Sequence, residues 1–115
     1  MKKLKRSECA VLPLVLKGLW YGMILYGEKH EEYRDFKAYW INRICKYWNN
    51  AKDEDIFRDT PLTRVVALSR GYQKADLFFV IEGISTRTES VHPDWGEPSA
   101  QHFVITLGER IELEE

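Results

Sequence analysis

The sequence predicts a single α+β domain over residues 1–115: a small, partly open β-barrel of about five or six strands with two or three helices. Its 115 residues match the length of one domain with one hydrophobic core. Apolar residues make up 44% of the chain and aromatic residues 13%, which is enough material for that core and argues against a disordered chain. Helical periodicity is confined to the first half, whereas strand-length apolar runs between turn residues fill the second half.

The first two predicted elements are a strand and a short helix. The continuous apolar run Val11–Leu16 suits a strand buried on both faces, and Pro13 places the start of this strand at a sheet edge or a bulge. The stretch Leu19–Tyr26 is too short and too apolar for a surface helix, so we expect a helix of roughly two to three turns. Gly27 follows it directly, in the position where helices commonly end with a left-handed residue.

A short charged strand is predicted over residues 28–34. Strand alternation would place His30, Glu32 and Arg34 on one face and Lys29, Glu31 and Tyr33 on the other.

A second helix is predicted over residues 36–48, FKAYWINRICKYW, with Asp35 as its N-cap. We expect it to end near Asn49 and Asn50. Its large apolar side chains recur at helical spacing, at Phe36, Trp40, Ile44 and Tyr47.

The remainder of the chain predicts β-structure after one acidic loop. Residues 51–61 are turn-rich, and we expect a loop there with one helical turn around residues 54–57. A long loop is expected over residues 86–100, which contain two prolines and a glycine, and Gly108 is expected to form a turn. The predicted strands are residues 64–70, 75–84, 101–107 and 110–113.

The distribution of charge bears on possible partners. A net charge of −1 argues against a strong binder of polyanions that ignores sequence. Residues 1–48, however, hold ten Lys and Arg against five Asp and Glu, and residues 49–115 hold seven against thirteen. A basic surface contributed by the N-terminal half is therefore compatible with the whole-chain value.

Other composition signals argue against a metal centre and a membrane span. The three histidines and two cysteines share no ligand spacing, so we expect neither a metal nor a cofactor. The longest apolar runs fall far short of the ~20 residues of a spanning helix, so no membrane partner is expected. The N-terminal stretch MKKLKRSECAVLPLVL lacks an A-x-A-like cleavage site and contains Glu8 and Pro13, which favours a cytoplasmic chain. No pattern indicates an oligomeric state.

The octapeptide GEKHEEYR, residues 27–34, is the strongest functional candidate. Lys29, Glu32 and Arg34 lie within six residues, so they can pair with one another. A glutamate can accept a hydrogen bond from an exocyclic amine of a base, while lysine and arginine donate to carbonyls or phosphates. Two other interpretations of this octapeptide are a charged segment that is merely exposed to solvent and an ion pair with a purely structural role. Aromatic side chains able to stack on bases are expected nearby, at Trp20, Tyr21, Tyr39, Trp40 and Tyr72.

The octapeptide resembles the GxKxxExR signature of ASCH domains, a branch of the PUA-like fold, with Gly27, Lys29, Glu32 and Arg34 in the four signature positions. The flank LVLKGLWYGMILYGEK is similar to the strand and helix that enter the motif in that family. RDFKAYWINRI, SRGY, PDWG and FVITLGERI resemble a subgroup of small bacterial and phage ASCH proteins. The resemblance covers nearly all of residues 11–113, the expected domain core.

This resemblance implies a β-barrel with helices packed at one side and a cleft beside the motif, and the binding of RNA or modified nucleosides. In one enzymatic branch of the family the motif lysine is catalytic in deacetylating N4-acetylcytidine, with a threonine three residues later as nucleophile. Lys29 matches that lysine, but Glu32 occupies the threonine position, and a carboxylate does not replace an activated hydroxyl.

Three functions follow as hypotheses. The leading one is a domain that binds single-stranded RNA or a nucleoside-like small molecule, with Lys29, Glu32 and Arg34 as the floor of the site and Lys17, Arg70 and Tyr72 at its rim. The second is an enzyme, an amidohydrolase on acylated nucleosides or a ribonuclease. In that enzyme Lys29 would be the catalytic base or electrostatic group, and Glu32 or Tyr72 its proton-transfer partner. The third is a protein-interaction module built on exposed aromatic side chains such as Trp48 and Trp95.

Overall fold

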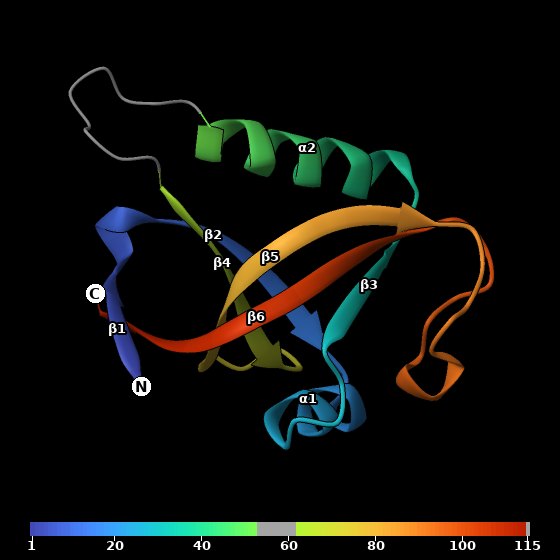
Figure 1. Cartoon of the computed structure of the whole chain (residues 1–115), viewed down its shortest axis with the longest axis horizontal. Coiled ribbons are helices and arrows are strands. Elements are labelled where there is room, and N and C mark those ends of the chain that lie inside the picture. The colour runs from blue at the N-terminus through green and yellow to red at the C-terminus, as the bar shows by residue number, and fades with distance from the viewer. Residues whose placement is uncertain (53–61, 115) are drawn as a thin grey trace.

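The computed structural model describes residues 1–52 and 62–114 (Figure 1). These residues form two α-helices, α1 (Gly18–Leu25) and α2 (Ala38–Lys52), and two 3₁₀ turns, η1 (Arg6–Glu8) and η2 (Pro93–Trp95). The strands are β1 (Lys2–Lys5), β2 (Cys9–Leu16), β3 (Glu31–Asp35), β4 (Thr63–Arg70), β5 (Leu77–Arg87) and β6 (His102–Glu114).

All six strands belong to one mixed sheet, in the order β1-β6-β5-β4-β2, with β3 also paired to β6. The pairs β1–β6 and β2–β4 are parallel and the other pairs are antiparallel. β3 pairs with the start of β6 and β1 with its end. Within the described residues no strand pairing joins β2 to β3, so the curled sheet is not closed. This confirms the α+β class and agrees with a partly open barrel.

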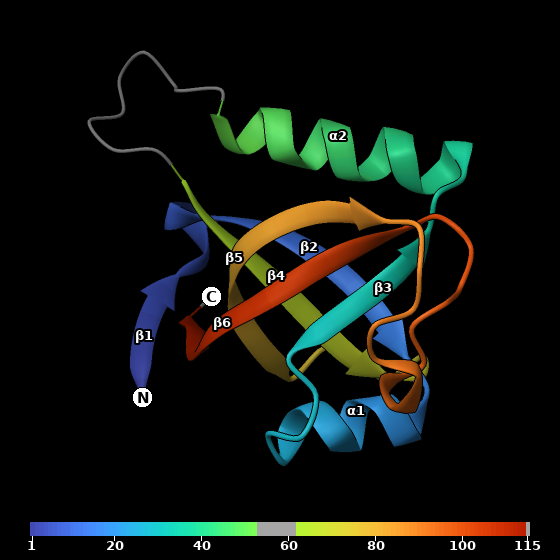
Figure 2. The same cartoon turned by 45° about the vertical axis from the view of Figure 1, so that its right-hand side comes forward.

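The two α-helices lie at opposite ends of the sheet, with α2 above the strands and α1 below them (Figures 1 and 2). The expectation that the helices pack together at one side is therefore wrong. α1 adds Ile24 to the core and α2 adds Tyr47, whose single hydroxyl proton is shared between the carbonyl oxygens of Ala10 and Val65, 3.0 and 3.2 Å away. Most of the core comes from inward side chains of the strands, including Leu12, Leu14, Val66, Leu68, Leu77 and Ile105.

β2 is an edge strand with one buried face. Leu12, Leu14 and Leu16 are buried, whereas Pro13 and Val15 are exposed. The prediction that Pro13 marks an edge is confirmed, because β2 is the last strand in the sheet order and pairs only with β4 among the described strands. The prediction that both faces are buried is wrong, since an edge strand of an open sheet has no second layer over its outer face.

α1 ends as predicted at Gly27, whose φ of 80° is left-handed. The amide of Gly27 donates to the carbonyl of Ile24 at 3.1 Å, and the amide of Glu28 donates to the carbonyl of Met23 at 2.8 Å. This pair of bonds is the Schellman arrangement of a helix C-terminus. It turns the chain directly from α1 into the charged motif.

β3 and α2 both begin later than predicted. β3 starts at Glu31, so Lys29 precedes the strand and does not share a face with Glu31 and Tyr33. Asp35 is the last residue of β3, and α2 starts at Ala38, so Asp35 is not the N-cap of the helix. The charged residues Glu31–Asp35 form a strand because each of them is paired with a residue of the antiparallel strand β6.

β6 is one continuous strand, so the predicted turn at Gly108 is wrong. The paired strands β5 and β6 shift register between Phe79 and Gly83, opposite this glycine. A Cβ atom at Gly108 would lie 2.8 Å from Cγ of Glu82 and 3.1 Å from the carbonyl oxygen of Val80. Glycine is therefore needed for close approach of two strands and does not break the strand.

The other predicted strands appear with shifted ends. Residues 64–70 correspond to β4, and residues 75–84 to β5, which starts two residues later and continues to Arg87. β1 was not predicted, because its sequence KKLK has a single apolar residue. The loop predicted over residues 51–61 begins inside α2, and its residues 53–61 lie outside the described residues. Among the described helices, none is both long and apolar enough to cross a membrane.

Candidate functional site

A cavity of about 660 Å³ lies between β2 and β3, two strands of the sheet that do not pair with each other. Exposed side chains such as Lys17 and Tyr39 stand on its lining, so the cavity opens to the surface. Its lining comes from five parts of the chain: Pro13, Val15, Leu16 and Lys17 of β2 and its end, Trp20 of α1, Lys29 and Glu32–Asp35 around β3, Tyr39, Trp40 and Arg43 of α2, and Trp95, Gly96 and Pro98.

Lys29 and Glu32 form a buried ion pair in the wall of this cavity. Their residues are 2% and 4% exposed, and Nζ of Lys29 lies 3.1 Å from Oε1 of Glu32. The amide of Tyr33 also donates to Oε1, at 3.0 Å, and NH1 of Arg34 lies 3.2 Å from Oε2. Three donors therefore hold the Glu32 carboxylate in one orientation.

Burial disfavours the charged ammonium form of Lys29. Desolvation lowers the pKa of Lys29 below its ordinary value, the nearby Glu32 carboxylate opposes this shift, and Arg34 adds to it. Nζ of Lys29 lies 4.8 Å from the ring centroid of Trp20 and 5.1 Å from that of Tyr33. Glu32 takes only one of the three ammonium donors in the described structure, so two remain for a ligand.

Arg34 bridges β2 and β3, which do not pair with each other. Its NH2 donates to the carbonyl of Val15 on β2 at 3.0 Å, and its NH1 donates to the carbonyl of Tyr33 on β3 at 2.6 Å. The guanidinium thus satisfies edge carbonyls that a neighbouring strand would otherwise satisfy. Arg34 therefore makes structural contacts with Glu32 and with both strands, and these contacts are compatible with a functional role of the same cluster.

The structure brings together four of the six predicted binding residues. Lys17, Lys29, Glu32 and Arg34 all line the cavity. Arg70 and Tyr72 do not line it.

The two remaining side chains lie elsewhere on the surface. The side chain of Tyr72 is fully exposed, in the turn after β4. The guanidinium of Arg70 lies beside Gly18, with its Nε 3.1 Å from the place of a Cβ atom there.

The aromatic side chains expected near the motif divide in the same way. Trp20, Tyr39 and Trp40 line the cavity, whereas the hydroxyl of Tyr21 donates to Asp76 at 2.6 Å. Tyr72, as noted, lies outside the lining.

The aromatic residues named for a protein-interaction patch are half-buried, so the expectation that they are exposed is wrong. Trp48 lies under the guanidinium of Arg64, 3.5 Å from ring centroid to Cζ. Trp95 lines the cavity.

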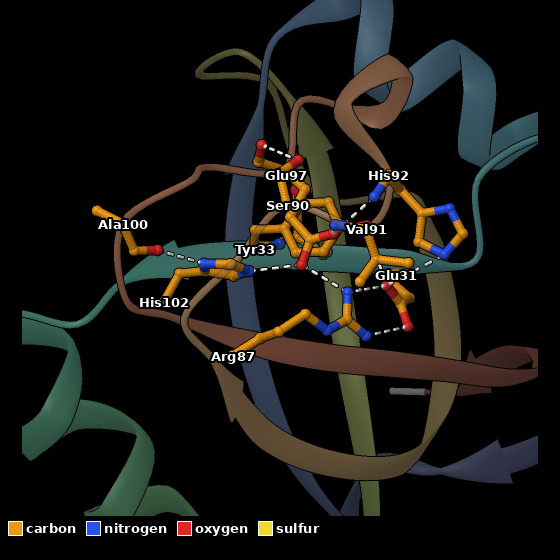
Figure 3. Close-up of polar contacts among 10 residues, drawn as sticks. Glu31, Tyr33, Arg87, Ser90, Val91, His92, Glu97, Ala100 and His102 are labelled. Atoms are coloured by element: carbon orange, nitrogen blue, oxygen red, sulfur yellow. Dashed lines mark hydrogen bonds and ion pairs between the residues drawn. The ribbon is translucent and has the colours of Figure 1, made fainter.

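Sequence reasoning missed a second, partly buried charge cluster, which we call the Glu97 network: Glu31, Arg87, Glu97 and His102 (Figure 3). NH1 of Arg87 lies 2.5 Å from Oε2 of Glu97, and its NH2 lies 3.2 Å from Oε2 of Glu31. Nε2 of His102 lies 2.6 Å from Oε2 of Glu97, and both residues are buried. Arg87 and Glu31 are 56 residues apart in sequence, so no local spacing reveals this network.

Glu97 accepts two further bonds, from the amides of Val91 and His92 at 2.7 and 2.8 Å. Burial acts to raise the pKa of Glu97, but the bonds from His102, from these two amides and from Arg87 outweigh it and lower the pKa to about 2. The carboxylate therefore stays ionised and fixes the segment of residues 88–101 to the sheet.

This segment supplies one wall of the cavity through Trp95 and Gly96. The ring of Trp95 stacks on His92, with centroids 3.9 Å apart and planes at 13°, and meets the ring of His30 edge-on at 5.6 Å. Gly96 has a φ of 80°, and a Cβ atom there would lie 2.6 Å from Cζ2 of Trp20. Trp20 thus packs directly on backbone, which fixes the indole beside Lys29.

Among the described residues no group of three or more His, Cys, Asp or Glu is arranged to hold a metal ion. Comparison with known proteins finds no matching family model, no matching curated protein and no matching solved structure.

Proposed function

We propose that this chain is an ASCH domain of the PUA-like fold that binds single-stranded RNA or a modified nucleoside in the cavity between β2 and β3. The observation that carries the proposal is the buried Lys29–Glu32 pair in the wall of a cavity that also presents aromatic rings. The residues assigned to the ligand are Lys29, Glu32 and Arg34, with Lys17 at the rim.

The polar chemistry of the pair suits the edge of a base. Lys29 has two donors free for a carbonyl oxygen or a ring nitrogen. Glu32 offers about four acceptor positions as a carboxylate, and three are occupied by Lys29, Tyr33 and Arg34. One position on Oε2 is left for a donor such as an exocyclic amine. Donor and acceptor thus stand side by side, as base recognition requires.

The apolar chemistry of the cavity suits the faces of a base. Trp20 and Tyr39 present aromatic surface in the lining, and stacking on such side chains contributes roughly 1–3 kcal/mol per base. The volume of about 660 Å³ lies within the range of pockets that enclose small molecules. A buried ion pair costs desolvation energy, which is a reason to expect that such a pair in a cavity wall serves recognition.

The test is a titration of a short single-stranded RNA pool, and then of a panel of nucleosides, into wild type and Lys29→Met. Methionine keeps the length of the side chain, and the loss of a charge-assisted bond of roughly 1.5–3 kcal/mol predicts about 10-fold to 100-fold weaker binding. Lys37→Met is the matched control, since Lys37 is exposed and does not line the cavity. Thermal melts of both variants verify folding. Equal affinity of wild type and Lys29→Met would refute the proposal.

The lowered pKa of Lys29 favours a second candidate, hydrolysis of an acylated nucleoside or of RNA. A lysine with a lowered pKa is unprotonated in a larger fraction of the molecules at neutral pH, and only the unprotonated amine can accept a proton. Lys29 would be the general base, with Glu32 as its partner. Incubation of N4-acetylcytidine, and separately of RNA, with excess protein tests it. Release of acetate or of RNA fragments that is lost in Lys29→Met is expected, and the absence of any product would exclude this candidate.

A further inference from the structure

The cavity carries more positive charge than its own carboxylates neutralise. Four cationic side chains line it, and only two carboxylates, those of Glu32 and Asp35. Glu32 is shared by two of the cations, and Asp35 pairs with Lys37, which lies outside the lining. Within the described part of the chain the remaining two lining cations, Lys17 and Arg43, have no carboxylate partner.

Arg43 has unused donors although much of it is covered. The described structure gives this guanidinium one hydrogen bond, from NH1 to the hydroxyl of Tyr39 at 3.3 Å. Its Nε is buried without a partner. Nε of Arg64 shares that property, but Arg64 lies on Trp48 and outside the cavity lining. Arg43 therefore combines three features: a free charge, spare donors and a place in the cavity.

Arg43 and Arg34 stand beside the same indole. Cζ of Arg34 lies 5.2 Å and Cζ of Arg43 5.8 Å from the ring centroid of Trp40. The guanidinium of Arg43 offers planar, directional donors that match the oxygens of a phosphate group. Arg34, whose NH1 and NH2 already bond the carbonyls of Tyr33 and Val15, adds positive charge beside it.

The two unpaired cations lie at opposite ends of the cavity. Lys17 immediately precedes α1, and Arg43 belongs to α2. β3 runs from the α1 end towards the α2 end, and it carries Glu32 and Arg34 (Figure 2). The base-recognition pair therefore stands between two positive positions, one near each helix.

We propose that Arg43, with Arg34 and Trp40, forms a phosphate-binding position at the α2 end of the cavity, and that Lys17 serves a second phosphate at the α1 end. The ligand is then a segment of a single-stranded nucleic acid with phosphodiesters on both sides of the recognised base, and not a free nucleoside. This inference rests on the proposed function and narrows its ligand class. Lys29 and Glu32 read the base, whereas Arg43 and Lys17 hold the chain.

The test compares a mixed-sequence RNA octamer with the four nucleosides, for wild type, Arg43→Gln, Lys17→Gln and Lys46→Gln. Lys46 is the matched control, an exposed cation of α2 outside the cavity lining. We expect Arg43→Gln and Lys17→Gln each to weaken octamer binding about five- to tenfold at low salt. The slope of log K against log salt should fall by about 0.7 for each lost phosphate contact on a single strand. Lys46→Gln should match wild type, and Arg43→Lys should retain part of the salt slope.

The outcomes separate the two proposals. If wild type binds the octamer and Arg43→Gln equals Lys46→Gln in affinity and salt slope, the phosphate position is refuted and the proposed function stands. If nucleosides bind as tightly as the octamer and without salt dependence, the inference is refuted in favour of a nucleoside site. If wild type binds neither, both proposals fail. Circular dichroism of each variant shows that a loss of binding is not a loss of folding.

Discussion

Glu32 is the residue on which the geometry of the motif depends. Its two carboxylate oxygens accept from Lys29, from the amide of Tyr33 and from Arg34. A buried cation without such a partner is costly, so Glu32 is what permits Lys29 to keep a charge inside the wall. The same carboxylate fixes the arginine that reaches across to β2. Glu32 thus positions both Lys29, the residue proposed to bind the ligand, and Arg34, the residue that joins β3 to β2.

Glu97 has the corresponding role behind the segment that carries Trp95 and Gly96, and its lowered pKa predicts a pH dependence of stability. Its pKa is lowered from 4.5 to about 2 in the folded protein. Between these two values the unfolded chain binds more protons at this group than the folded protein does, so stability falls as the pH falls. We expect the free energy of unfolding in urea to drop between about pH 4.5 and pH 2, and to drop less steeply in Glu97→Gln.

The control for this experiment is Glu89→Gln, since Glu89 is an exposed carboxylate on the same segment. It should keep the steep acid dependence of wild type. An acid dependence of Glu97→Gln as steep as that of wild type would show that the loss of stability comes from other carboxylates.

How well a site residue could be predicted from sequence depends on where its partners lie. Lys29, Glu32 and Arg34 were found because the motif is contiguous and its members contact one another. Glu97 was not found, because its partner Arg87 is ten residues away and Glu31 joins the network from another strand. Arg43 was not predicted either, because sequence alone does not show which face of α2 lines the cavity.

At the scale of elements, the segment of residues 88–101 is a wall of the cavity that is attached to the sheet through the bonds of Glu97 and packs on Trp20 at Gly96. Gly96→Ala tests the second point. The new Cβ atom would lie 2.6 Å from Cζ2 of Trp20 at a φ of +80°. We expect a loss of about 1–3 kcal/mol in the free energy of unfolding and a changed tryptophan emission, because the indole has to move.

Gly27→Ala is the matched control for the wall. Gly27 has the same φ of +80°, but nothing lies within 4 Å of a Cβ atom there. It should carry only the cost of the left-handed conformation, about 1 kcal/mol, with unchanged emission. If both variants lose the same stability and keep the emission of wild type, Trp20 does not pack on Gly96 as described.

Elements were predictable where the chain itself supplies the pattern. The apolar runs of β4 and β5 and the helix end at Gly27 required no knowledge of distant residues. β1 was missed because its charged sequence becomes a strand only through pairing with the end of β6. The predicted break at Gly108 was wrong because the glycine accommodates β5, which sequence alone does not bring close.

At the scale of the whole molecule, the open sheet creates the site. β2 and β3 stand next to each other without strand pairing, and the bridging guanidinium of Arg34 takes the place of ladder bonds. A closed sheet would fill this position with backbone hydrogen bonds and leave no cavity. The central claim is therefore that a nucleic-acid base enters the opening between β2 and β3.

The four tryptophans make this claim directly measurable, because three of them line the cavity, Trp20, Trp40 and Trp95, and Trp48 does not. The measurement is a titration of a short single-stranded RNA into ¹⁵N-labelled protein, followed through the indole N–H signals. Single Trp→Phe variants assign each signal. The proposal predicts that the three cavity indoles shift together with increasing RNA while the signal of Trp48 stays in place. Saturation with RNA that leaves the three cavity signals unmoved, or that shifts Trp48 alone, would contradict it.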